Sequence, residues 1–349
     1  MNFNLVSLIR ENIRNLTPYS TARDEFQGVA SVFLDANESP FNNEINRYPD
    51  PLQQELKVKV SRLKNVHPDQ IFFGNGSDEA IDLVYRAFCN PGIDNVVAMK
   101  PTYGMYKVAA DINGVEYREV LLNEYFMLDS KKMLQSTDAQ TKAIFLCSPN
   151  NPTANNLVRD DVIHLLDNFN GIVVLDEAYA DFSEQESFLS LLDHYPNLIV
   201  LQTFSKAWGM AGIRLGMAFA SKEIIRVFNQ IKYPYNINIL TQRKALDMLK
   251  GVDRKNKNVK MVIAERTQLL LELNKLEIIQ QVFPTDANFV LVRFENSKAV
   301  YNWLLEQKII VRDRSKVALC EGCLRITVGT KTENKALIKA LTSFVQGRK

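Results

Sequence analysis

The chain has 349 residues, of which 46% are hydrophobic and 23% are charged, and its formal net charge is +2. The composition is typical of a globular protein, and the length indicates two subdomains rather than one small core. A charge so near neutral does not favour binding to nucleic acid or to a membrane surface. No apolar run approaches the roughly 20 residues of a membrane span, and the N-terminus lacks the features of a signal peptide. Because there are also only four cysteines, we expect a reduced, cytoplasmic protein.

The middle of the chain alternates apolar runs with helical patterns. Near-continuous apolar runs lie at 96–99, 143–147, 172–175 and 198–201. Such runs are typical of strands that are buried on both faces. Between them lie segments such as 160–169, in which apolar residues recur at helical spacing. This βαβ pattern predicts an α/β fold, with a mostly parallel sheet covered by helices.

The C-terminal third has a different pattern, which predicts a smaller α+β domain. A long amphipathic helix is expected at 262–279, and strands are expected at 288–294 and 324–328, with a helix at 297–307 between them. The expected domains are an N-terminal arm with part of the small domain at 1–39, a large cofactor-binding domain at 40–245, and the small C-terminal domain at 246–349.

One short motif in this third contains two of the cysteines, Cys320 and Cys323, separated by a glutamate and a glycine. A structural zinc site needs about four ligands, and the three histidines of the chain are scattered along it. We therefore expect no metal, and we interpret the motif as a turn between two strands.

Polar side chains follow three of the buried runs. Ligands of open α/β sheets bind outside the carboxyl ends of the strands. Asn151 follows the run at 143–147, and Asp176 and Tyr179 follow the run at 172–175. Ser205 and Lys206 follow the run at 198–201, with Arg214 eight residues beyond Lys206. Each has an ordinary alternative, since Asp176 could cap a helix and Lys206 could be a solvated lysine. Their joint occurrence in this order indicates one site.

These groups match what pyridoxal phosphate (PLP) needs. Lys206 would form an imine with the cofactor aldehyde. Asp176 would keep the pyridine nitrogen protonated, so that the ring acts as an electron sink. Tyr179 and Asn151 suit the ring hydroxyl, and the cofactor phosphate needs backbone amides, hydroxyls and a cation.

A glycine-rich turn at 74–79 can supply the phosphate cradle. It follows a strand-like run at 71–73 and precedes a helical pattern at 80–88. Gly76 permits a tight turn, and Ser77 would cap the helix and offer its hydroxyl. The motif is neither the dinucleotide fingerprint nor a P-loop. An ordinary capped helix is the alternative.

Two acidic residues of this turn, Asp78 and Glu79, stabilise a helix start but would repel a phosphate. We therefore expect Ser205 and Arg214 to compensate for their charge, with Asp78 remaining part of the cofactor-binding turn. Tyr103 follows the run at 96–99. It would stack on the pyridine ring, although a core tyrosine is the alternative.

The motifs together resemble a known family. The series NGSDE, SPNNPT, DEAY, TFSKAWGMAGIRLG and LRITVGT is similar to that of the fold-type I, aspartate-aminotransferase-like PLP enzymes, in the same order and over nearly the whole chain. Within these class II aminotransferases the chain resembles the histidinol-phosphate aminotransferases. That closer resemblance rests on LTPY at 16–19, DANESP at 35–40, RYPD at 47–50, IVRDR at 310–314 and GCLRITVGT at 322–330.

The resemblance implies a PLP-dependent aminotransferase of histidine biosynthesis, which converts L-histidinol phosphate and 2-oxoglutarate into imidazole-acetol phosphate and L-glutamate. It also implies a homodimer in which Tyr48 reaches the cofactor phosphate of the neighbouring subunit. Tyr19, Asn37, Arg312 and Arg325 would line the substrate pocket. Two guanidinium groups suit a dianionic phosphate better than one, but Arg312 could instead form a surface ion pair.

Other readings of the same motifs stay open. The chain could be an aromatic or branched-chain aminotransferase, or a phosphothreonine decarboxylase of the same fold. A non-catalytic regulator is disfavoured because no basic recognition helix is present. The chain also departs from the family in carrying Ala154 where glycine usually follows Asn-Pro-Thr. If that residue has a positive φ, alanine is strained there by about 1 kcal/mol.

Overall fold

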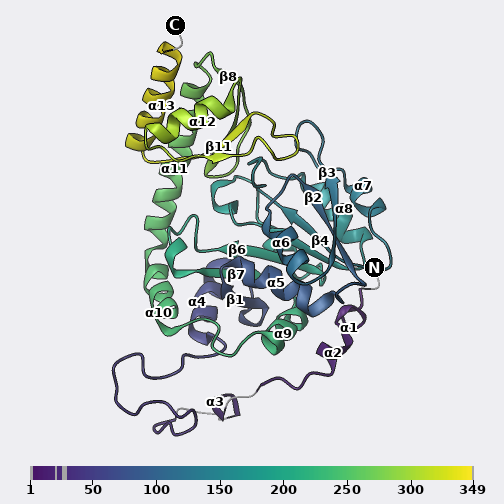
Figure 1. Ribbon diagram of the computed structural model, residues 1–349. Coiled ribbons are helices and arrows are strands. Elements are labelled where there is room, and N and C mark those ends of the chain that lie inside the picture. The colour runs from purple at the N-terminus through teal and green to yellow at the C-terminus, as the bar shows by residue number, and fades with distance from the viewer. Residues whose placement is uncertain (1–2, 20–21, 26–29, 348–349) are drawn as a thin grey trace.

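The computed structural model describes residues 3–19, 22–25 and 30–347, and these fold around two β-sheets of different size (Figure 1). The strands of the larger sheet are β1 (Ile71–Asn75), β2 (Asn95–Lys100), β3 (Glu116–Leu121), β4 (Thr141–Cys147), β5 (Ile172–Asp176), β6 (Leu198–Thr203) and β7 (Leu215–Phe219). Those of the smaller sheet are β8 (Ile279–Val282), β9 (Phe289–Phe294), β10 (Arg312–Asp313) and β11 (Cys323–Thr327). The α-helices are α1 (Leu5–Leu8), α2 (Glu11–Arg14), α3 (Ala22–Glu25), α4 (Gln54–Lys64), α5 (Ser77–Phe88), α6 (Met105–Ile112), α7 (Ser130–Gln135), α8 (Arg159–Asn168), α9 (Lys222–Ile231), α10 (Ile239–Met248), α11 (Val252–Leu273), α12 (Ser297–Glu306) and α13 (Lys331–Gln346).

The larger sheet has the strand order β1-β7-β6-β5-β4-β2-β3. β7 runs antiparallel to both of its neighbours, and the other adjacent pairs are parallel. The four apolar runs of the sequence lie in β2, β4, β5 and β6. The predicted mostly parallel sheet is therefore confirmed, and the parallel strands place their carboxyl ends at one edge.

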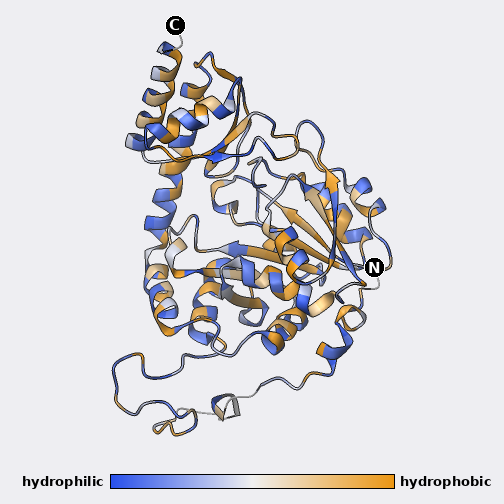
Figure 2. Cartoon of the chain, viewed as in Figure 1, coloured by the Kyte–Doolittle hydropathy of each residue, from blue (hydrophilic) through white to orange (hydrophobic). Residues whose placement is uncertain are grey.

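Alternate residues of these strands enter two separate cores, which explains why the runs are continuously apolar. Val97 and Met99 of β2 pack with α4, α7 and α8 on one face. Val96 and Ala98 pack with α5, α6 and α9 on the other. The central strands are accordingly orange in the hydropathy view (Figure 2). Within the described ranges, no helix combines the length and apolar character that a membrane crossing requires.

The smaller sheet is fully antiparallel, with the order β10-β11-β9-β8. Helices α11, α12 and α13 contribute to its core. The expected strands at 288–294 and 324–328 and the helix at 297–307 are confirmed as β9, β11 and α12. The expected helix at 262–279 is wrong at both ends, because α11 begins at Val252 and ends at Leu273. Its first turns are polar and charged, so they lack the apolar periodicity that predicts a helix.

The N-terminal residues lie against the larger sheet's helices before the chain leaves the body. Leu5, Leu8 and Ile9 pack on the core that contains α5, and Arg10 Nη1 donates to the carbonyl of Arg86 at 3.1 Å. This start of the 1–39 segment therefore contacts the larger sheet's layer rather than the smaller sheet. Part of that segment (1–2, 20–21 and 26–29) lies outside the described residues. The stretch from 30 to 50 forms an extended loop that projects from the rest of the chain (Figure 1).

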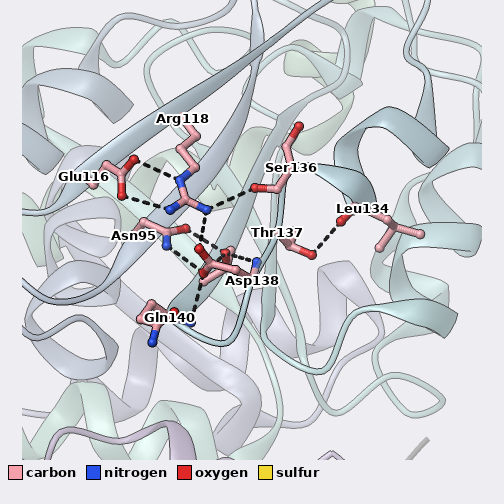
Figure 3. Close-up of polar contacts among 9 residues, drawn as sticks. Asn95, Glu116, Arg118, Leu134, Ser136, Thr137, Asp138 and Gln140 are labelled. Carbon is pink, nitrogen blue, oxygen red and sulfur yellow. Dashed lines mark hydrogen bonds and ion pairs between the residues drawn. The ribbon is translucent and has the colours of Figure 1, made fainter.

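A network of paired charges ties together the amino ends of β2, β3 and β4 (Figure 3). Nε and Nη2 of Arg118 donate to Glu116, at 2.9 and 3.0 Å, and its Nη1 donates to Asp138 at 2.7 Å. Asn95 Nδ2 donates to the same Asp138 carboxylate at 2.9 Å. The charged groups at this edge of the sheet thus satisfy one another.

Candidate active site

A pocket lies at the carboxyl ends of β4, β5 and β6, beside the start of α5. Its lining residues are Gly76, Ser77, Asp78, Tyr103, Cys147, Asn151, Asp176, Ala178, Tyr179, Thr203, Ser205, Lys206, Ala211 and Arg214. Every residue that the sequence assigned to the cofactor within one subunit lines this pocket. The structure thus brings together side chains that lie as far apart in the sequence as Gly76 and Arg214. Their roles toward a ligand remain predictions.

Asp176 ends β5 with a carboxylate that is almost fully buried, at 2% exposure. Burial raises the pKa of Asp176 to about 6, against the hydrogen bonds that Ala178 and Tyr106 donate to it. Those bonds run from Ala178 N to Oδ1 and from Tyr106 Oη to Oδ2, both at 2.9 Å. Sequence reasoning missed Tyr106, because its position on α6 carries only the signal of a core aromatic residue. The carboxyl group is held in place by two hydrogen bonds, and its burial disfavours the ionised form.

Lys206 lies in the loop after β6 and lines the pocket. Its Nζ lies 5.4 Å from the centroid of the Tyr179 ring. Burial by the pocket walls lowers the pKa of Lys206, and the charge of Arg325 lowers it further, whereas Asp176 opposes the shift. A lower pKa makes the neutral amine, which is the nucleophilic form, more abundant.

Asn151 connects this site to the smaller sheet. Its Nδ2 donates to the hydroxyl of Tyr179 at 3.3 Å, and its Oδ1 accepts from Nη1 of Arg325 on β11. Burial raises the pKa of Tyr179 above its ordinary value. The amide and the phenol predicted to flank one ring hydroxyl therefore do lie side by side.

The turn before α5 forms a cradle that only glycine allows. Gly76 has φ +72°, and a Cβ there would meet the Arg214 guanidinium. Gly76 takes the N-cap position of α5, so Ser77 is the first helical residue and makes no capping bond. The expectation that Ser77 caps the helix is therefore wrong. The structure leaves its hydroxyl and the first amides of a twelve-residue helix directed at the pocket end of the sheet.

The two acidic residues of the turn behave differently. Glu79 Oε2 accepts from the backbone amide of Asn75 at 2.6 Å and so is already bonded. Asp78 faces Arg214 at 3.5 Å and accepts from the Tyr103 hydroxyl at 3.1 Å. Only the Asp78 charge therefore remains for Arg214 to offset at the pocket.

Together these residues fit PLP. A pocket amine, a buried carboxyl group, a paired phenol and amide, and a helix start with a nearby guanidinium provide one partner for each part of the cofactor. The crowding of Gly76 against Arg214 shows that a side chain there would fill the cradle.

Ala154, in the loop after β4, has the positive φ at which alanine is strained. Its φ is +71° and it is fully buried, so alanine occupies a backbone conformation that favours glycine. Its amide donates to the carbonyl of Asn150 at 2.7 Å, and its carbonyl accepts from the amide of Asp286 at 2.8 Å. The loop shape holds despite the methyl group.

The residues expected to bind substrate lie in two places. Arg312 and Arg325 are directly opposite each other on β10 and β11. Asn37 and Tyr48 belong to the projecting stretch 30–50 and Tyr19 precedes it, and none of the three lines the pocket of its own chain. Tyr48 is 51% exposed and stacks on Tyr235, with ring centroids 4.6 Å apart.

The cysteine motif forms a turn before β11. The amide of Cys323 donates to the carbonyl of Cys320 at 2.9 Å, and both thiols are buried and free. In the part of the chain that the structure describes, no group of three or more His, Cys, Asp or Glu side chains could hold a metal ion.

Comparisons with known proteins give the family. The model of aminotransferase class I and II matches residues 19–341. The chain is 57% identical to histidinol-phosphate aminotransferase of Bacteroides fragilis (strain YCH46), over 97% of this chain and 99% of that one. It is 53% identical to that of Cytophaga hutchinsonii, over 99% and 100%. The solved histidinol-phosphate aminotransferase from Clostridium acetobutylicum has a TM-score of 0.80 at 26% identity, covering 87% of this chain and 92% of that one. The chain belongs to the class I and II aminotransferase family, among the histidinol-phosphate aminotransferases.

Proposed function

We propose that the chain catalyses PLP-dependent transfer of the amino group of L-histidinol phosphate to 2-oxoglutarate, which yields imidazole-acetol phosphate and L-glutamate. The observation that carries the proposal is one pocket in which Lys206, Asp176 and the α5 turn meet, linked through Asn151 to Arg325. The names of relatives that are more than half identical over nearly the whole chain support this choice of substrate.

Bound PLP supplies an aldehyde for the amine and a ring that accepts electron density from the substrate Cα. Lys206 would hold the cofactor through its aldehyde, and its amine, freed by the incoming substrate amine, would take the proton from the substrate Cα and return it to the cofactor. Asp176, whose pKa of about 6 leaves it mostly ionised at neutral pH, would accept a hydrogen bond from the pyridine nitrogen and so favour its protonated form. Asn151 and Tyr179 hydrogen-bond the ring hydroxyl.

The remaining pocket residues hold the cofactor in place. Ser77, Ser205 and Arg214 line the pocket and, with the Gly76 turn and the first amides of α5, would bind the cofactor phosphate. Tyr103, whose hydroxyl donates to Asp78, would stack on the pyridine ring. This arrangement leaves Lys206 free to move while the cofactor stays anchored.

The substrate anion would bind on the side of the smaller sheet. Arg325 reaches the pocket wall through Asn151, and Arg312 stands opposite it in the adjacent strand. The same pair would hold the substrate phosphate in one half-reaction and a carboxylate of 2-oxoglutarate in the other. Among the described residues, no carboxylate forms an ion pair with Arg312, as the surface alternative would require.

The direct test is to incubate the protein with PLP, L-histidinol phosphate and 2-oxoglutarate and to follow glutamate formation. L-phenylalanine and phosphothreonine run alongside. We expect fastest turnover with L-histidinol phosphate. A preference for L-phenylalanine would instead identify an aromatic aminotransferase, and carbon dioxide from phosphothreonine would identify a decarboxylase.

We further propose a homodimer with shared active sites. The projecting N-terminal segment carries exposed apolar side chains, among them Leu34 at 90% and Phe41 at 82% exposure, which a second copy would cover. Tyr48 would then reach the partner's cofactor phosphate, and Tyr19 and Asn37 the partner's substrate pocket. Dissociated and reassociated mixtures of Lys206→Ala and Tyr48→Ala chains test this. Shared sites predict activity above that of both parents, and no gain on mixing would contradict sharing.

The location of the protein in the cell and its division into domains are also proposals. We propose a cytoplasmic location, which the four buried free thiols support. We propose the division into an N-terminal arm with part of the small domain at 1–39, a large domain at 40–245 and a small domain at 246–349, although position 246 falls within α10. Limited proteolysis would locate the boundaries.

A further inference from the structure

A third arginine shares a face of the smaller sheet with the two that were expected at the substrate. Arg312 stands opposite Arg325, and the amide of Arg314 donates to the carbonyl of Cys323 at 3.0 Å, which extends the same ladder. Because side chains alternate between the faces of a strand, Arg312, Arg314 and Arg325 point to one side. The opposite side, represented by Leu324, packs into the small-sheet core.

That shared face looks toward the pocket. Arg325 bonds the pocket residue Asn151, and its guanidinium lies 5.2 Å from the Phe289 ring centroid. Burial lowers the pKa of Arg314, and the charges of Arg325 and then Arg312 lower it further, while Tyr179 opposes the shift. Arg314 therefore lies within electrostatic reach of both partners and of a pocket-lining phenol.

The three guanidinium groups have no anionic partner in the described part of the chain. The ion pairs there include none of them, and Nε of Arg314 is buried without a hydrogen-bond partner. The nearest acid in sequence, Asp313, accepts instead from the Ser315 amide at 2.8 Å.

A neighbouring arginine on the same face has hydrogen-bond partners that Arg314 lacks. Arg293 pairs with Cys323 in the next strand, on the same face. Its guanidinium donates to the carbonyls of Glu321 at 3.1 Å and Leu319 at 3.0 Å. An arginine on this face can thus be fully bonded within the protein, and Arg314 is not.

We propose that Arg314 is a third anion-binding residue of the substrate pocket, and that with Arg312 and Arg325 it selects a phosphorylated amine over one that carries only carboxylates. Like charges held together without a counter-ion repel, and a dianionic phosphate offers oxygens to three guanidinium groups. A carboxylate has two oxygens, which one bidentate arginine satisfies. The inference rests on the proposed function and adds to it the residue that sets substrate class.

The test uses the PLP-loaded enzyme and its two half-reactions, with L-histidinol phosphate or L-glutamate as the amine. For Arg314→Gln we expect kcat/KM to fall about 10- to 100-fold with the phosphorylated amine and less than about threefold with glutamate, because a charged hydrogen bond is lost only in the first. Arg314→Lys keeps the charge and should recover part of the loss. Lys316→Gln removes an exposed charge from the same loop and should change neither half-reaction.

Binding of inorganic phosphate to the PLP-loaded enzyme gives a second readout, as inhibition of the glutamate half-reaction. Arg314→Gln should raise the inhibition constant, and Lys316→Gln should not. An equal fall with both amines, or no change in either readout, would overturn the inference. If the wild type does not convert L-histidinol phosphate, the proposed function fails, and the phosphate readout still decides whether Arg314 binds anions.

Discussion

The pKa values of charged side chains are shifted in opposite senses at the two edges of the seven-stranded sheet. At the amino edge, the Asn95 amide and then the Arg118 guanidinium hold the pKa of Asp138 below its ordinary value. At the carboxyl edge, burial raises the pKa of Asp176 to about 6 and lowers that of Lys206. One edge stabilises charged forms, and the other favours neutral ones.

The difference separates structural charge from functional charge. The Arg118 network satisfies its own members, so it needs nothing from outside the chain. At the carboxyl edge, Lys206 has no ion pair among the described residues and Arg214 faces Asp78 at 3.5 Å. A partly buried charge without a partner costs stability until a ligand supplies one. Ligand binding should therefore stabilise the protein through this edge and not through the other.

The largest expected effect is that of Lys206→Ala. Removing the amine that moves the proton should lower turnover by about 10²- to 10⁴-fold or more, measured as glutamate formation. PLP should still bind, because the α5 turn, Arg214 and Asp176 remain, and dialysis followed by cofactor absorbance would show it. Lys142→Ala, a lysine of the amino edge that faces Asp94 at 3.5 Å, is the matched control. Comparable turnover of both variants would contradict the role of Lys206.

Asp176→Asn should reduce turnover and also change how stability depends on pH. The carboxyl pKa is raised from 3.8 to about 6 in the fold, so ionisation opposes folding above pH 6, and the penalty disappears as the pH falls toward 4. Relative to wild type, the cofactor-free variant should gain on the order of 2–3 kcal/mol at pH 7 compared with pH 4. Urea unfolding at both values measures this. A difference that does not vary with pH would show that Asp176 is not held in a neutral-favouring site.

The sequence was sufficient to predict the pocket, because polar residues that follow buried parallel strands must meet at one edge. It did not reveal Tyr106, whose bond to Asp176 depends on how α6 packs against β5. The pattern also failed in α11, where the polar first turns are held by the ion pair of Lys255 with Asp181 at 2.8 Å and by the packing of Val259. Arg314 was overlooked because only strand register shows that it shares a face with Arg325. Periodicity reports burial, whereas these features depend on tertiary contacts.

Ala154→Gly should have a smaller effect, because three contributions nearly cancel. Glycine relieves about 1 kcal/mol of strain at φ +71°. It also loses a buried methyl group, worth about 0.8 kcal/mol, and makes the unfolded chain freer by about 0.4–1 kcal/mol. The methyl group packs in the cluster of Tyr179 and Phe289. We expect the free energy of unfolding to change by less than about 1 kcal/mol, and a clear stabilisation would show that the methyl group packs poorly.

The smallest effect is expected for Asp138→Asn, the same substitution as at Asp176 but at the opposite edge. Its pKa is lowered by the Asn95 amide and by Arg118, so ionised Asp138 favours folding. That contribution is present at neutral pH and is lost as the pH falls through the acid range. The variant should therefore be slightly less stable than wild type at pH 7 and equally stable in acid, which is the reverse of Asp176→Asn. Turnover should be unchanged. Parallel urea unfolding series on the two variants would reveal opposite slopes with pH if the two edges differ as the contacts indicate, and slopes of the same sign would break the comparison.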